Sequence, residues 1–351
     1  MINKIRFNNI FNNLLVIVLV LTMLLFISCG SGYGNEKHIL DLEFHKGTKG
    51  LDFEMFGLMP EFYEDTAFRL SVNLFNQGAY DIPSTNGGFI NLNLEKDHLC
   101  ITSDGKTCVS GDSGNKILIG ESSQLRGKSI LNPTGDFEIK DFYILVKGVD
   151  KQSKQSTTVA VTACYQYMTD LVTEVCLDPY YYDITKIDKP CEVKDLSFSG
   201  QGSPLSISNI ETKMLSSGKQ KVRPMFVITF QNSGNGKVIN KDMVEKVCSS
   251  STLPPNAFNV AHLRNIEFLN GKYFYNSDNI AGSNIQCDSS LVKGINLKSG
   301  TAKIVCSVKD TSENIIGSEI GTISTQMKIV VDYGYTMTES KKVTINSLDA
   351  K

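Results

Sequence analysis

The chain has 351 residues, with 35 Lys and Arg against 37 Asp and Glu, a formal net charge of −2 and no Trp. This length predicts two globular domains behind any leader. A hydrophobic fraction of 41% and a charged fraction of 21% exclude a wholly disordered chain. The near-neutral balance gives no basic field for nucleic acid, so no nucleic-acid partner is expected.

The amino terminus has the pattern of an export signal. Lys4 and Arg6 precede an apolar run, Leu14–Ile27, that only Thr22 interrupts. Such a run has the length of a signal-peptide core and is short for a helix that crosses about 30 Å of hydrocarbon. We therefore predict a signal peptide over residues 1–28. An uncleaved amino-terminal anchor helix is the alternative, and both place the rest of the chain outside the membrane.

The end of the apolar run contains a cysteine in a telling position. Ser28-Cys29-Gly30 follows Leu25-Phe26-Ile27 directly. This segment resembles the lipobox of prokaryotic lipoproteins, although Phe26 stands where Leu or Val is usual. The resemblance implies lipidation of Cys29 as the first mature residue, a lipidated tether over residues 29–37 and a membrane partner through the lipid. Two acyl chains anchor a protein far better than one.

Eight further cysteines follow Cys29, and an even count behind an export signal predicts four disulfides in an oxidising compartment. Proximity favours the pairs Cys100–Cys108, Cys164–Cys176 and Cys287–Cys306, which leaves Cys191 with Cys248 by elimination. The alternative is free thiols. Zinc ligation is not favoured, because no C-x₂-C pair occurs. The eight are Cys100, Cys108, Cys164, Cys176, Cys191, Cys248, Cys287 and Cys306.

The remaining chain alternates apolar and polar residues with a period of two. Phe68–Leu74, Ile90–Leu94 and Val159–Ala163 are clear examples, and turn residues such as Asn86-Gly87-Gly88 separate the runs. Many short strands at regular spacing indicate an all-β sandwich. Long helical periodicity is absent, and Asn240–Ser249 alone predicts a short helix, with Asn240 as its cap.

Two pairs of segments indicate an internal repeat. FRLSVNLFNQGAYDI at Phe68–Ile82 matches PMFVITFQNSGNGKVI at Pro224–Ile239 with a shift of 156 residues. Val159–Leu177 matches Met327–Ile345 with a shift of 168 residues, which places Tyr165 and Tyr167 on Tyr333 and Tyr335. The repeat predicts two tandem immunoglobulin-like β-sandwich domains, residues 38–190 and 191–351, with a boundary near residues 178–195.

A long alternating strand that runs into Asn-x-Gly, as at Asn76-Gln77-Gly78 and Asn232-Ser233-Gly234, resembles the immunoglobulin-like modules of bacteria and archaea. The cell-adhesion-related CARDB domain is the nearest named module. This resemblance implies extracellular binding or structural spacing, and it transfers no catalytic residue.

The sequence contains none of the common catalytic signatures. There is no G-x-S-x-G, no H-E-x-x-H, no P-loop and no G-x-G-x-x-G after a strand. The four His residues are scattered along the chain. We therefore expect no enzymatic activity, no metal and no cofactor. A hydrolase with loop carboxylates is the weakest alternative.

Three consecutive tyrosines form the most unusual local cluster. Tyr180, Tyr181 and Tyr182 follow Pro179, and one extended strand cannot bury all three rings. Tyrosine is enriched in binding surfaces, so these residues are candidates for binding. The alternative is a wedge that fixes the angle between the two domains.

The sequence thus predicts a lipid-anchored protein of the cell surface with a role in adhesion, envelope structure or the presentation of a binding surface. Its expected partners are the membrane, through the lipid, and another surface protein or a glycan. The alternative function is capture of a small ligand or sugar at the domain junction, near Tyr180–Tyr182.

Overall fold

Strands account for most of the described residues in the computed structural model, so the all-β prediction is confirmed. The structure describes residues 44–111, 114–121, 123–149, 153–183, 188–249, 252–288 and 294–348. The predicted signal peptide, the tether and Cys29 lie outside them. Asp41–Lys351 form one compact unit. Within the described residues, no helix has the length and apolar character to span a membrane.

Two smaller sheets have the same strand order. One follows β1-β3-β7-β5, and the other follows β15-β17-β11-β10-β9, with β18 beside β11. The bounds are β1 Leu51–Phe56, β3 Ala67–Asn76, β5 Leu99–Ile101, β7 Phe137–Val146, β9 Leu196–Ser197, β10 Leu205–Ser216, β11 Lys221–Asn232, β15 Ile285–Cys287, β17 Thr301–Val308 and β18 Ile316–Gly317.

A third sheet contains the two longest strands. Its order is β14-β13-β19-β8-β4-β6, with β2 and β12 beside β19 and β16 beside β13. The bounds are β2 Glu61–Tyr63, β4 Gly88–Leu94, β6 Lys116–Leu118, β8 Lys154–Leu177, β12 Lys237–Ile239, β13 Val260–Phe268, β14 Tyr273–Asn276, β16 Ile295–Asn296 and β19 Ile323–Asn346. The helices are η1 Lys241–Met243, α3 Val244–Ser249, η2 Pro255–Ala257 and η3 Ser277–Asn279.

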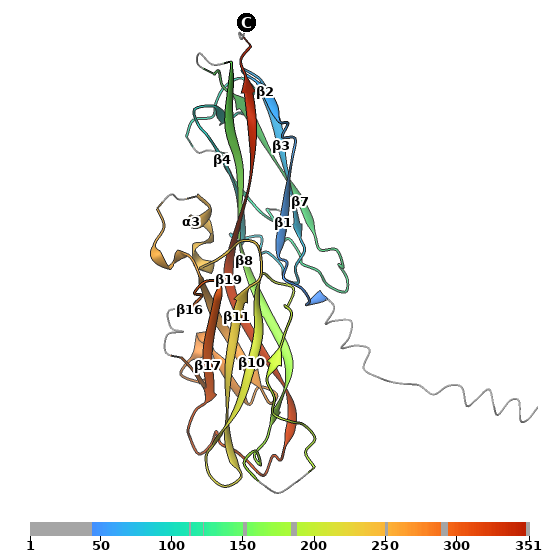
Figure 1. Ribbon diagram of the computed structural model, residues 1–351, viewed down its shortest axis with the longest axis vertical. Helices are drawn as coiled ribbons and strands as arrows, with labels where there is room; N and C mark the ends of the chain where they lie inside the picture. Colours follow the sequence, from blue (N-terminus) through green and yellow to red (C-terminus); the bar gives the residue numbers. More distant parts are fainter. Residues whose placement is uncertain are drawn as a thin grey trace, which may run out of the picture. The chain divides into compact units, whose positions relative to one another are not determined.

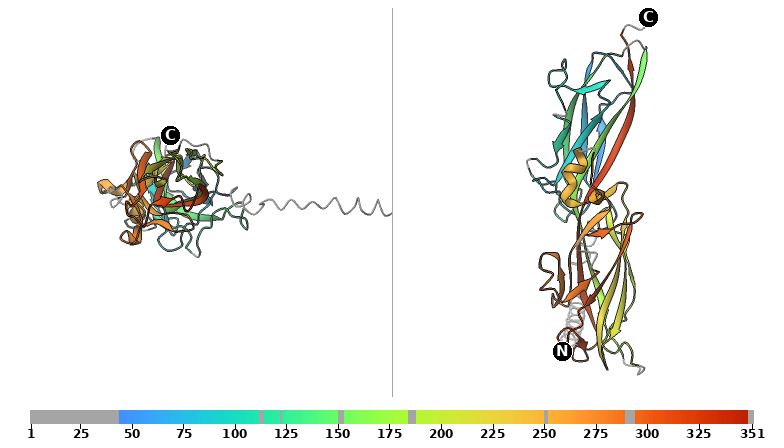
Figure 2. Two further views of the ribbon diagram at one scale, coloured as in Figure 1. Left: turned by 90° about the horizontal axis from the view of Figure 1, so that it is seen from below. Right: turned by 90° about the vertical axis from the view of Figure 1, so that its left-hand side faces the viewer.

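Strands β8 and β19 pair along their whole length, from Lys154 opposite Asn346 to Leu177 opposite Ile323. Each strand has 24 residues, which corresponds to about 80 Å of extended chain. Figure 1 shows them side by side between the other strands, and in the right-hand view of Figure 2 helix α3 lies against them.

The predicted repeat corresponds to equivalent strands. The order β1-β3-β7-β5 of the first half (β1 to β8) reappears as β10-β11-β17-β15 in the second half (β10 to β19). Gln166 lies opposite Gly334, with Tyr165 opposite Tyr335 and Tyr167 opposite Tyr333. The 168-residue shift carries Tyr165 to Tyr333 and Tyr167 to Tyr335. An approximate two-fold axis therefore relates the halves and passes through the pair Gln166–Gly334, a place that we call the crossing of β8 and β19.

The two halves share one sheet and one core. The carboxyl-terminal part of β19 pairs with Lys154–Val159 and with β2, both in the first half. One cluster of buried side chains contains Leu70 and Leu74 together with Phe226 and Phe230. The structure thus gives the all-β class, and the division into immunoglobulin-like domains at 190/191 stays a prediction.

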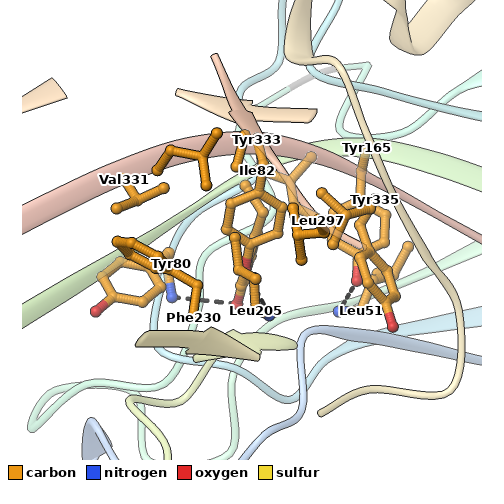
Figure 3. Packing of buried hydrophobic residues seen from close by; sticks show 14 of the residues in the cluster. Leu51, Tyr80, Ile82, Tyr165, Leu205, Phe230, Leu297, Val331, Tyr333 and Tyr335 are labelled. Carbon is orange, nitrogen blue, oxygen red and sulfur yellow. Dashed lines mark hydrogen bonds between the residues drawn. The ribbon is translucent and has the colours of Figure 1, made fainter. Parts of the chain in front are cut away.

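Four buried tyrosines form the centre of this core at the crossing: Tyr165, Tyr167, Tyr333 and Tyr335. Figure 3 labels three of them, Tyr165, Tyr333 and Tyr335. The hydroxyl of Tyr165 accepts a hydrogen bond from Leu51 N (3.1 Å), and the hydroxyl of Tyr333 accepts one from Leu205 N (3.3 Å). Leu51 and Leu205 begin equivalent strands. Burial raises the pKa of Tyr165 and Tyr333, so both stay neutral donors and acceptors.

The other two tyrosines hold the Asn-x-Gly turns. Tyr167 donates its hydroxyl proton to Asn76 Oδ1 (3.1 Å), and Tyr335 donates to Asn232 Oδ1 (3.2 Å). Burial raises the pKa of Tyr335 to about 12. The Y-x-Y segments thus connect the long strands to the turns that the repeat pattern singled out.

All eight predicted cysteines are in disulfides, and two of the four pairs were predicted correctly, Cys100–Cys108 and Cys287–Cys306. The other two predictions are wrong, since the bonds are Cys164–Cys248 and Cys176–Cys191. No hairpin brings Cys164 and Cys176 together. Both residues lie on β8, which continues without a turn and separates them by about 40 Å.

Candidate functional site

A polar cavity of about 250 Å³ lies beside the crossing of β8 and β19. Tyr167 and Tyr333 border it and are themselves buried. Five charged side chains surround these aromatic residues. The complete lining is Asp81, Pro83, Gln166, Tyr167, Met168, Lys241, Asp242, Arg264, Asp332 and Tyr333.

Strand alternation explains why polar side chains gather at this place. Successive side chains point to opposite faces of a sheet, so Gln166 and Asp332 lie on the face opposite to their tyrosine neighbours. Strand β13 pairs with β19 and brings Arg264 alongside. The connection between β3 and β4 supplies Asp81, and η1 supplies Lys241 and Asp242.

The short helix that forms one wall was predicted correctly in position. Asn240 accepts a hydrogen bond from Asp242 N at 3.1 Å, as its predicted role of cap requires. Val244 is buried, and Cys248 joins it in a small cluster with Phe89 and Cys164. The segment is divided into η1 and α3 rather than forming one helix.

Asp332 is the electrostatic centre of the cavity. Its side chain is 6% exposed, and its Oδ2 receives Arg264 Nε at 2.7 Å, Arg264 Nη2 at 2.7 Å and Lys241 Nζ at 3.3 Å. A buried carboxylate needs such partners, because an uncompensated charge there would be costly. Two cations thus share one anion, and the group of three carries a net positive charge.

Two further carboxylates border the cavity. Asp81 is held by Gly127 N (2.8 Å) and Gln124 Nε2 (3.0 Å). Asp242 is exposed, and among the described residues no hydrogen bond or ion pair holds its carboxylate. The cavity therefore presents carboxylate oxygens as well as cationic donors.

His262 is a titratable group close to Lys241. Its Nε2 is 3.3 Å from Asn240 Oδ1. Burial, together with the positive charge of Lys241, lowers the pKa of His262 below its ordinary value, against the opposing effect of Asp242 and Asp332. His262 is therefore neutral at pH 7 and adds no further positive charge to the cavity.

The tyrosine cluster predicted for binding lies elsewhere. Tyr180, Tyr181 and Tyr182 occupy a turn after β8, beyond Leu177, and the hydroxyl of Tyr182 bonds to Met214 O at 2.5 Å. Tyr181 and Tyr182 are 47% and 59% exposed, and their rings meet edge to face at 5.1 Å. This turn follows the end of β8, about 40 Å along the strand from Tyr165, and Tyr180 donates to Ser318 O of the second half at 3.5 Å. The binding role and the wedge both stay predictions.

Sequence reasoning missed the charged residues of the cavity. One signal was present: Asp332 directly follows the apolar run Ile329–Val331, where a strand buried on both faces has little room for a charge. Its partners come from segments far apart in the chain. Within the described residues, no group of three or more His, Cys, Asp or Glu is arranged to hold a metal ion.

Comparison with known proteins gives no family. No protein-family model matches the chain, and no curated protein matches it. The C-terminal domain of the Streptococcus pyogenes antigen I/II-family protein AspA is 7% identical, with 86% of this chain and 100% of that chain covered and a TM-score of 0.17. The C-terminal domain of the Streptococcus agalactiae AgI/II polypeptide BspA is 10% identical, with 82% of this chain and 93% of that chain covered and a TM-score of 0.14. Such low scores do not establish a common fold, and no functional argument follows from them.

Proposed function

We propose that the chain is a lipid-anchored protein of the cell surface with a non-catalytic role in adhesion, envelope structure or the presentation of a binding surface. The four disulfides are the observation that carries this proposal. Disulfides form and persist in oxidising compartments outside the cytoplasm. The lipobox-like Ser28-Cys29-Gly30 supplies the anchor, and a surface protein or a glycan is the proposed partner.

The paired strands β8 and β19 support a structural role. A continuous ladder through both halves couples them by backbone hydrogen bonds as well as by side-chain packing. A surface protein benefits from such coupling, because a mechanical load or the effect of a bound partner at one end is then transmitted to the other end.

Acylation tests the anchor directly. The full chain is expressed in a bacterium that processes lipoproteins, together with Cys29→Ala and, as a matched control, Ser31→Ala. The wild-type chain and the Ser31 variant should incorporate a labelled fatty acid, stay with the membranes and be shaved from intact cells by protease. Cys29→Ala should lose the label. An intact Met1 terminus on the wild-type chain, or labelling that persists in Cys29→Ala, contradicts the proposal.

A second candidate function has its own supporting observation. The polar cavity at the crossing is lined by residues of both halves, whereas the sequence places small-ligand capture near Tyr180–Tyr182. We infer that any small-molecule capture takes place at this cavity. Ligand-induced stabilisation of the purified chain is its test, since a ligand that binds only the folded state raises the melting temperature.

A further inference from the structure

The cavity is not a by-product of the repeat. Gly88 pairs with Tyr165 in the first half as Ala261 pairs with Tyr333 in the second, so these two residues are equivalent. Only residues 83–87 lead from Ile82 to Gly88, whereas residues 239–260 lead from Val238 to Ala261. The second half thus carries a longer connection, which contains η1, α3 and η2.

This connection is fixed on the first half. Cys248 is bonded to Cys164 of β8, and Glu245 forms an ion pair with Lys116 of β6 at 2.7 Å. Its apolar residues cover Phe89 and Cys164. By the 168-residue shift, Cys164 is the equivalent of Asp332. The connection therefore covers the site around Cys164. The equivalent site around the buried carboxylate of Asp332 is open and has Lys241 at its border.

The cationic side of the open cavity suits a carboxylate. Arginine has five N–H donors, of which Arg264 uses Nε and Nη2 on Asp332. Lys241 has three donors, of which one faces Asp332. The remaining donors belong to side chains that are 49% and 37% exposed. Arg and Lys together form strong charge-assisted hydrogen bonds with a carboxylate.

The acidic side suits an ammonium group. Asp242 follows Lys241 directly and has no hydrogen-bond partner for its carboxylate among the described residues. Asp81 faces the cavity from the first half. A ligand with a carboxylate but no cationic group would be repelled by Asp242 and Asp81. A ligand with a cationic group but no carboxylate would be repelled by Arg264 and Lys241.

The volume limits the ligand to a small molecule. About 250 Å³ is below the usual range of roughly 300–1,000 Å³ for drug-sized ligands and corresponds to about eight water molecules of liquid. We propose that the cavity binds a zwitterion of the α-amino acid class, with its carboxylate on Arg264 and Lys241 and its ammonium group on Asp242 and Asp81. This inference rests on the second candidate function above.

A binding panel tests the assignment. The purified mature chain is titrated calorimetrically with the twenty standard amino acids, and for each binder with its des-amino acid and its decarboxylated amine. Glucuronate represents acidic sugars. At least one amino acid should bind, and either single-group analogue should bind at least tenfold more weakly. Arg264→Gln and Asp242→Asn should each weaken binding at least tenfold.

Arg69→Gln is the matched control, because Arg69 forms a comparable two-point ion pair with Asp141 (2.9 and 2.7 Å) on β3, away from the cavity. The Arg69→Gln variant should bind amino acids with the same affinity as the wild-type chain. Asp242→Asn keeps the test independent of folding, since the exposed carboxylate holds no other residue.

Three results would overturn the zwitterion assignment: no binding by any amino acid, equal binding of the des-amino acid, or affinities unchanged in both Arg264→Gln and Asp242→Asn. Binding of glucuronate, or of a des-amino acid as tightly as its amino acid, through Arg264 would refute the assignment but leave the cavity as a ligand site. The acylation experiment stands apart, so failure of the surface role is distinguished from failure of this inference.

Discussion

The Asn-x-Gly turns of the two halves make the same contacts in different surroundings. Asn76 donates to Tyr80 O (2.8 Å), and Asn232 donates to Gly236 O (2.9 Å), while each accepts from its tyrosine. Only Asn76 is fully buried, and it also donates to Leu125 O at 2.9 Å. The repeat thus preserves the backbone role of the turn, and the loop that covers it decides how much the turn contributes to stability.

The connections that follow these turns differ more. The short one in the first half simply enters β4, whereas the long one in the second half reaches across to the first half and borders the cavity. The inserted segment adds Lys241 and Asp242 to the Arg264 and Asp332 that the strands of the second half supply. The following predictions test this contrast.

The disulfide of the long connection should have the largest effect. Cys164 and Cys248 are 84 residues apart in sequence, while Cys100 and Cys108 are 8 apart. Loop entropy predicts a loss of about 4–5 kcal/mol for the double Ser variant of the first pair and about 2–3 kcal/mol for that of the second. Urea unfolding without reductant measures both. An equal or smaller loss at Cys164–Cys248 would contradict the view that this bond secures the connection.

The two asparagines should rank next. Asn76→Ala leaves the carbonyl of Tyr80 without its side-chain donor and Leu125 O with Ile82 N alone, and it removes the acceptor of the Tyr167 hydroxyl. We expect a loss of about 3 kcal/mol. Asn232→Ala removes one such bond in a half-exposed site and should cost about 1.5 kcal/mol. Chemical denaturation compares the two variants directly. If Asn232→Ala is the more damaging, burial does not set the difference.

The pH dependence at His262 should be the smallest effect. His262 occupies the position equivalent to Phe89, next to Lys241, Asp242 and Asp332 rather than in an apolar cluster. Its pKa is lowered in the folded state, so below the ordinary value of 6.5 the unfolded chain binds the extra proton first. Stability should fall as the pH drops below 6.5, and less so in His262→Gln. Melting temperatures at pH 7.5 and 5.5 check this, and identical pH slopes would count against it.

Local pattern was sufficient for much of the fold. The alternation of Phe68–Leu74 gave β3, the Asn240 cap gave the start of η1, and the equal spacing of Y-x-Y gave the repeat. The pairing of Cys164 with Cys176 failed because period-two alternation does not tell one long strand from two short ones. The strand pairing of β8 with β19 joins residues more than 140 positions apart, which no local pattern reports.

The cavity was less predictable than the fold. Asp81, Lys241, Arg264 and Asp332 come from four separate segments, and only Asp332, beside its apolar run, differs in sequence from an ordinary surface charge. Only the long-range pairing of β13 with β19 and the placement of the connection bring them together. Tyr180–Tyr182 were candidates because they are adjacent in sequence, but the cavity is formed by residues that are far apart in sequence.

The pairing of Lys154 with Asn346 also determines when the first half can be completed. Because synthesis starts at the amino terminus, β8 is complete long before β19. Until β19 is made, β8 has an unpaired edge and β2 lacks its parallel neighbour. Such non-local closure slows folding and lengthens the exposure of unpaired strand edges. The first half therefore stays prone to aggregation until Asn346 is available to pair with Lys154.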